Sequence, residues 1–176
     1  MPAQAFVDAL NEQIANEFAA SHQYTAIAAQ YEADTFPRLA GFFYAQALKE
    51  RTHAMMMVKY LLDTGAKVVF TAIDVPRMDF EDHVAPIRQA LEQERSVSQR
   101  ISEIFELARE QRDYLSEQFI QWFLKEQVEE EATMSELLEI AERVREQPME
   151  LEKYIARENP GGGPQDQFAP EAAGGA

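Results

Sequence analysis

A carboxylate and an imidazole stand three residues apart in the stretch Glu50-Arg51-Thr52-His53 of this chain. Because residues three apart share one face of a helix, Glu50 and His53 point the same way. Apolar residues recur around them at steps of three and four, which places this face toward the core of a helical bundle. A buried ionised carboxylate is costly, and a metal ion held with further carboxylates is one arrangement that offsets the cost. The stretch therefore predicts a metal site if other helices place carboxylates opposite it.

The composition limits the class of protein. The 176 residues suffice for one domain with its own core, and 27% charged and 46% hydrophobic residues are ordinary for a globular protein. No apolar run of about 18 residues predicts a membrane span, and no signal peptide is evident, so we expect a cytoplasmic protein. The absence of cysteine excludes disulfides and thiolate ligands. The net charge of −15 disfavours nucleic acids and anionic membranes as partners and favours cations.

Four long helices and a short one follow from the apolar pattern and its breaks. Pro37 suits the start of the second helix, Gly65 its end, and Asp113 the N-cap of the fourth. The third helix begins at His83 or Pro86. The expected helices cover residues 3–33, 37–64, 83–112, 114–145 and 148–157.

The periodicity fails between Gly65 and Asp82, which predicts a long loop. A helix of about 28 residues is about 42 Å long. About twenty residues of extended chain reach about 65 Å. The loop can therefore cross the whole bundle and leave the second and third helices parallel. We expect an all-α bundle over residues 1–158, including the short fifth helix, and a flexible tail rich in Gly, Pro and Ala over residues 159–176.

Polar residues interrupt the apolar seam near the midpoint of every long helix. They are Glu17 in the first helix, Glu50 and His53 in the second, Glu94 in the third, and Gln127 and Glu130 in the fourth. A single seam glutamate is more often a buried, hydrogen-bonded residue than a ligand. Four helices that each place a carboxylate at one level instead indicate a two-metal site for Fe, Mn or Zn.

Each metal has an expected set of ligands. The first set is Glu17, Glu50 and His53, and the second is Glu50, Glu94 and Glu130, with Gln127 nearby. Glu50 belongs to both sets, so its carboxylate is the expected bridge between the metals.

At these residues the sequence resembles the bacterial-type, non-haem ferritins. The resemblance covers about residues 5–158. It is carried by Asn16-Glu17-Phe18, Tyr24, Glu50-Arg51-Thr52-His53-Ala54, Glu94 and Glu126-Gln127-Val128-Glu129-Glu130. It implies a ferritin-like four-helix bundle that assembles into a cage of twenty-four subunits and stores ferric mineral. It also implies a ferroxidase centre that binds two Fe per subunit and uses O2 or H2O2, with Tyr24 beside the metal ligands.

Two positions depart from the family's pattern. Lys49 stands where such ferritins often carry a carboxylate that helps to bind a third iron. We expect Lys49 to face Glu126, so that its ammonium replaces that third cation. Haem-containing relatives have a second E-x-x-H motif on the fourth helix. They also have a haem-ligating methionine directly after the glutamate of the E-x-x-H motif on the second helix. This chain has Gln127 to Glu130 and Arg51 instead, so we expect no haem.

Two other classes of function stay open. The first is another diiron-carboxylate oxidase or peroxidase, although a rubrerythrin-like peroxidase would need a cysteine-based site that this chain lacks. The second is a DNA-protecting shell like the mini-ferritins, which calls for basic arms and a site at a dimer interface. The acidic composition of this chain disfavours that shell.

Overall fold

The computed structural model describes residues 1–162 and 166–174, and every regular element in that part is a helix. The elements are α1 (Gln4–Ala33), α2 (Pro37–Asp63), α3 (Ala85–Glu110), α4 (Tyr114–Arg143) and α5 (Pro148–Glu158). The expected bundle with a short fifth helix is confirmed, although α3 and α4 each end two residues earlier than the pattern indicated. Within the same residues, no helix combines the length and the apolar character needed to cross a bilayer.

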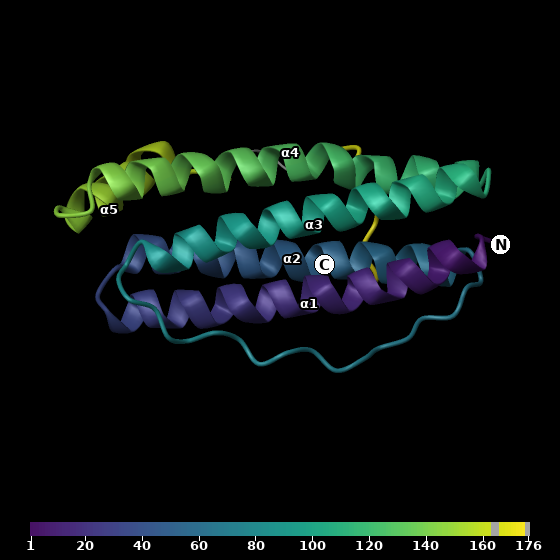
Figure 1. The fold of residues 1–176 in the computed structure, drawn as a ribbon, viewed down its shortest axis with the longest axis horizontal. Coiled ribbons are helices and arrows are strands. Elements are labelled where there is room, and N and C mark those ends of the chain that lie inside the picture. The colour runs from purple at the N-terminus through teal and green to yellow at the C-terminus, as the bar shows by residue number, and fades with distance from the viewer. Residues whose placement is uncertain (163–165, 175–176) are drawn as a thin grey trace.

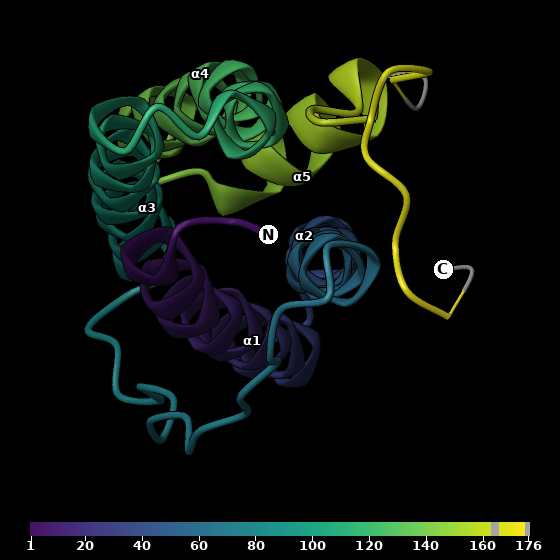
Figure 2. The same ribbon diagram turned by 90° about the vertical axis from the view of Figure 1, so that its right-hand side faces the viewer.

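The four long helices form two antiparallel pairs, α1 with α2 and α3 with α4 (Figures 1 and 2). The segment between α2 and α3 runs along the whole length of the bundle, so α2 and α3 point the same way, as expected (Figure 1). The short α5 packs against α2 and α4 at one end. This order places the midpoints of all four long helices at one level.

Two side-chain amides of α1 hold the long loop against the bundle. Asn11 donates to the Lys67 carbonyl at 2.9 Å and accepts from the Val69 N–H at 2.7 Å. Gln23 does the same with Arg77, donating to its carbonyl at 2.9 Å and accepting from its N–H at 2.8 Å. Because each amide satisfies both groups of a backbone segment, the loop follows a defined path without secondary structure of its own.

Two helix ends lie at the residues that the sequence indicated, Gly65 and Asp113. Gly65 has a φ of +71°, which a residue without a Cβ adopts freely, and the Ala66 N–H then closes α2 on the Leu61 carbonyl at 2.8 Å. The Asp113 side chain accepts from the Ser116 N–H at 3.3 Å, which confirms the expected N-cap of α4. Its second oxygen accepts from the Ala3 N–H at 2.9 Å, so the cap also ties α4 to the start of α1.

The core consists of two apolar clusters. One includes Tyr24, Phe43 and Leu137 and extends to α5, whereas the other includes Leu10 and Met57 and extends to the far end of the bundle. The polar seam residues lie between the two clusters along every long helix. The fold thus surrounds one polar layer with apolar packing on both sides.

Residues 166–174 lie against α2 and α4. The Ala173 N–H donates to the Met55 carbonyl of α2 at 3.0 Å, and Asp166 contacts side chains of α4. Residues 163–165 and 175–176 of the expected tail lie outside the described residues. The flexibility expected for residues 159–176 stays a prediction.

Candidate metal centre

All six polar seam residues are buried in the middle layer of the bundle. Glu17, Glu50, Glu94 and Glu130 are each 1% exposed, and His53 and Gln127 are 2% and 5% exposed. Every long helix contributes at least one of them. Four carboxyl groups excluded from water in one layer are unusual without a cation, because each charge would otherwise be poorly solvated.

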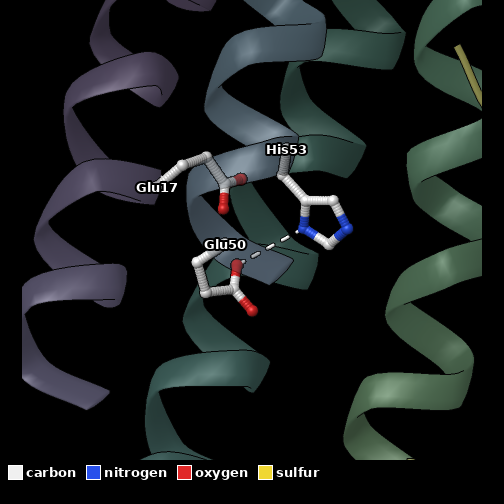
Figure 3. Close-up of side chains that lie close together, drawn as sticks. All are labelled: Glu17, Glu50 and His53. Atoms are coloured by element: carbon white, nitrogen blue, oxygen red, sulfur yellow. Dashed lines mark ion pairs between the residues drawn. The ribbon is translucent and has the colours of Figure 1, made fainter. Parts of the chain in front are cut away.

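Glu17, Glu50 and His53 lie close together within this layer (Figure 3). One ligand atom from each lies within 4.8 Å of the others, and His53 Nδ1 is 3.4 Å from Glu50 Oε2. Gln13, one turn before Glu17, donates to Glu17 Oε1 at 2.8 Å. The other oxygen of Glu17 and Oε1 of Glu50 are buried without a hydrogen-bond partner. These two free oxygens, together with the imidazole, fit the first expected ligand set.

Glu94 is held by two neutral donors. The Tyr24 hydroxyl donates to Glu94 Oε1, and Gln127 Nε2 donates to Glu94 Oε2 at 3.1 Å. Among the described residues, the second expected set does not bring one ligand atom from each of Glu50, Glu94 and Glu130 within 4.8 Å of the others. The first expected set, Glu17, Glu50 and His53, does. The structure therefore places the second expected set in the same layer but does not draw its oxygens together.

Lys49 supplies a positive charge at the edge of the layer. Its Nζ lies 2.6 Å from Glu126 Oε1 and 2.6 Å from Glu130 Oε1. The contact with Glu126 was expected, whereas the contact with Glu130 was not. Both contacts are ion pairs between the ammonium and a carboxylate. His53, Glu126 and Glu130 also place ligand atoms within 4.8 Å of one another, so the ammonium lies beside a second group that could hold a cation.

Burial sets the protonation of the four carboxyl groups. It raises the pKa of Glu17 well above the ordinary value, and the neighbouring charge of Glu50 raises it further. Burial, followed by the charges of Glu94 and Glu130, does the same to the pKa of Glu50. Burial also raises the pKa of Glu94 and of Glu130, although Lys49 opposes the rise at Glu130. A cation entering this layer must therefore displace protons.

The charge of Lys49 is stabilised in turn. Burial lowers the pKa of its ammonium, but the carboxylates of Glu130 and Glu126 outweigh this effect and hold the pKa above its ordinary value. Lys49 therefore stays charged and remains a permanent cation beside the layer.

Comparison with known proteins agrees with this geometry. A family model described as a ferritin-like domain matches residues 7–144. The chain belongs to the ferritin family. This ferritin is 47% identical over 167 residues to ferritin BfrB of Mycolicibacterium smegmatis, an alignment that covers 95% of this chain and 92% of the relative. It is 38% identical over 132 residues to a bacterial non-heme ferritin of Staphylococcus aureus, covering 75% of this chain and 80% of the relative.

A solved structure supports the same assignment. An open pore ferritin from the archaeon Archaeoglobus fulgidus superposes with a TM-score of 0.85 at 27% identity and covers 88% of this chain and 96% of its own. Ferritins store iron, and iron storage is therefore the function class of this chain.

Contacts of the site that were not anticipated from the sequence include the Gln13–Glu17 hydrogen bond, the Lys49–Glu130 ion pair and the grouping of Glu126 with His53. Gln13 stands four residues before Glu17 on the same helix face, so its spacing was a usable signal. The other two depend on how closely α2 approaches α4, which spacing along one helix does not report.

Proposed function

We propose that this ferritin oxidises Fe(II) to Fe(III) at a ferroxidase centre in the middle of each subunit and stores the product as ferric mineral. The proposed ligands are Glu17, Glu50, His53, Glu94 and Glu130, with Gln127 and Tyr24 placing Glu94. Two Fe(II) ions per subunit each give up one electron, and the pair of electrons reduces O2 to H2O2 or H2O2 to water.

One observation carries the proposal. Glu17 Oε2 and Glu50 Oε1 are buried without a hydrogen-bond partner beside the imidazole of His53. In the metal-free protein a proton shared between the two carboxyl groups offsets part of the cost of burying them, and an Fe(II) ion bound by carboxylate and imidazole would take the place of that proton. The same two carboxyl groups have raised pKa values, so iron binding would release their protons.

The surrounding residues prepare the ligands for this chemistry. Gln13 donates to one oxygen of Glu17, which leaves the other oxygen available to bind iron. Tyr24 and Gln127 donate to the two oxygens of Glu94, so this carboxylate is oriented before iron arrives. Partners of this kind typically change metal affinity about 10- to 100-fold when they are removed.

Storage requires a container, and we propose a cage of 24 subunits. The support is the family and the near-complete coverage of relatives that are named ferritins. A cage of this 20.1 kDa chain has a mass of about 480 kDa. Light scattering on the purified protein tests this directly. One species near that mass that retains ferric iron after loading is the expected result, and a dimer that precipitates its iron would contradict it.

The remaining parts of the proposal are a cytoplasmic location and a chain without haem. The haem-free state is supported by the exposed Arg51 that follows Glu50, and by Gln127 at the helix position where a second E-x-x-H would begin. One relative of 42% identity is named bacterioferritin BfrB in Mycobacterium tuberculosis, so haem binding needs a direct test. An absorption spectrum of the purified protein decides it, because bound haem gives a strong Soret band.

A DNA-protecting shell and a different diiron oxidase are the competing functions. A gel-shift assay with duplex DNA at low salt tests the first, and retention of DNA would favour it over simple storage. The measured mass tests the second, since such oxidases are small oligomers.

A further inference from the structure

The segment 166–174, here called the C-terminal segment, bridges α2 and α4. Asp166 Oδ2 accepts from Trp122 Nε1 at 3.3 Å and from Lys125 Nζ at 3.0 Å, both on α4. The Ala173 N–H donates to the Met55 carbonyl of α2 at 3.0 Å. Figure 2 shows this segment, in yellow, running from near α5 past α2. The segment is therefore fixed at both of its ends to the two helices that carry His53 and Glu130.

The carboxylate of Asp166 is oriented by its own turn. Its Oδ1 accepts from the Phe168 N–H at 2.9 Å, and the Ala169 N–H donates to the Asp166 carbonyl at 3.0 Å. The hydrogen bond from Phe168 and the ion pair with Lys125 hold the pKa of Asp166 below its ordinary value. Asp166 thus presents Oδ2 to α4 as an ionised acceptor.

Trp122 lies between Asp166 and a proposed metal ligand. Its indole meets the His53 ring edge-on, with the ring centroids 5.8 Å apart and an interplanar angle of 75°. The ring centroid of Phe123 lies 4.9 Å from that of the indole and 5.8 Å from that of His53. Two aromatic rings of α4 therefore contact the imidazole edge-to-face, and pairs of this kind have a preferred geometry.

A cavity lies under the C-terminal segment and reaches the same imidazole. Its volume is about 360 Å³. Its lining includes Lys49, His53, Trp122, Glu126, Asp166 and Ala169. His53 thus borders a space that is also lined by Asp166 and Ala169 of the C-terminal segment.

We propose that Asp166 is a positioning residue for the metal centre, which holds the indole of Trp122 so that the indole fixes the ring plane of His53. The role rests on the proposed function, because it requires His53 to bind the metal. It gives the C-terminal segment a part in metal binding, although that segment contributes no ligand.

Fluorescence and calorimetry test this role together. Trp122 is the only tryptophan of the chain, so its emission reports on the contact with Asp166 without interference. The probe is Co(II), which binds the ligands of Fe(II) without being oxidised, titrated anaerobically into the full-length protein. The variant is Asp166→Ala, and the matched control is Lys125→Met, which removes the other partner of Asp166 and leaves the indole bond in place.

In Asp166→Ala we expect tryptophan emission at longer wavelength and Co(II) affinity about three- to tenfold weaker, below the effect of a direct partner of a ligand. Lys125→Met should stay within about twofold of the native affinity, because the contact with Trp122 survives. A second background isolates the indole bond. Trp122→Phe keeps a ring beside His53 but has no N–H, so adding Asp166→Ala to it should cost no further affinity.

Each contrary result has a distinct meaning. Equal Co(II) affinity in the native protein and Asp166→Ala would overturn the positioning role and leave the metal centre standing. An undiminished effect of Asp166→Ala in the Trp122→Phe background would also overturn it, because the charge of Asp166 would then act without the indole. Failure of Co(II) to bind the native protein would overturn the proposed metal centre and the positioning role together.

Discussion

Replacing Lys49 with methionine should turn an ion pair into an additional cation site. The ammonium of Lys49 lies 2.6 Å from carboxylate oxygens of both Glu126 and Glu130. Methionine keeps most of the apolar stem of the side chain and removes the charged ammonium. The two carboxylates then face each other without a counter-ion, and a divalent cation can bind between them.

The size of the effect follows from burial. Removing one partner of a buried ion pair costs about 3–5 kcal/mol. The Lys49 side chain is 33% exposed, so water screens part of the interaction, and we expect a loss of about 2 kcal/mol in the metal-free protein. A divalent ion at about a hundred times its Kd contributes about 2.7 kcal/mol, which is enough to restore the loss.

Two measurements check this prediction. Anaerobic calorimetric titration with Co(II) should count two sites per subunit in the native protein and one more in Lys49→Met. Thermal unfolding at fixed protein concentration should be lowered in metal-free Lys49→Met and recover with Co(II). Lys153→Met is the matched control, because the pair of Lys153 with Glu150 is exposed and contributes little. An unchanged site count in Lys49→Met, or three comparably tight sites in the native protein, would refute the reasoning.

Two further predictions concern the middle layer. Tyr24→Phe removes the hydroxyl that orients Glu94 but keeps the ring that packs on Phe43 at 5.7 Å, so Co(II) affinity should fall about tenfold while the helical circular dichroism stays native. An unchanged affinity would show that Glu94 needs no such partner. The raised pKa of Glu17 means that the folded, metal-free protein keeps a proton above pH 4.5 that the unfolded chain has released, so stability should fall as pH rises above that value. Glu17→Gln should flatten this decline in thermal unfolding between about pH 5 and 8, and an identical decline in both proteins would count against the assignment.

Local signals in the sequence account for most of the fold. Pro37, Gly65 and Asp113 mark helix ends because each acts through its own backbone geometry or through a neighbour a few residues away. The path of the loop does not follow from such signals. Asn11 and Gln23 bind backbone groups more than fifty residues ahead in the chain, and only the assembled bundle brings these groups within reach.

The sequence indicates which polar residues share the buried layer, but it indicates much less about how they contact one another. A charged residue on an apolar seam is visible in one helix, and the antiparallel order of the helices aligns four such positions. The ion pair of Lys49 with Glu130 and the hydrogen bond of Tyr24 to Glu94 depend on side-chain conformation between helices. The docking of Asp166 on Trp122 joins α4 to a stretch of low sequence complexity, for which periodicity gives no information.

The most direct test of the proposed function is the rate of Fe(II) oxidation in air. It compares the native protein with Glu50→Ala, and the exposed Glu12→Ala on α1 serves as the control. The appearance of Fe(III) is followed by its ultraviolet absorbance. Glu50 is the proposed shared ligand of both metals, so oxidation should be fast in the native protein and Glu12→Ala and nearly absent in Glu50→Ala. Equal, slow oxidation in all three proteins would contradict a ferroxidase centre in this layer, even though the ferritin fold would stand.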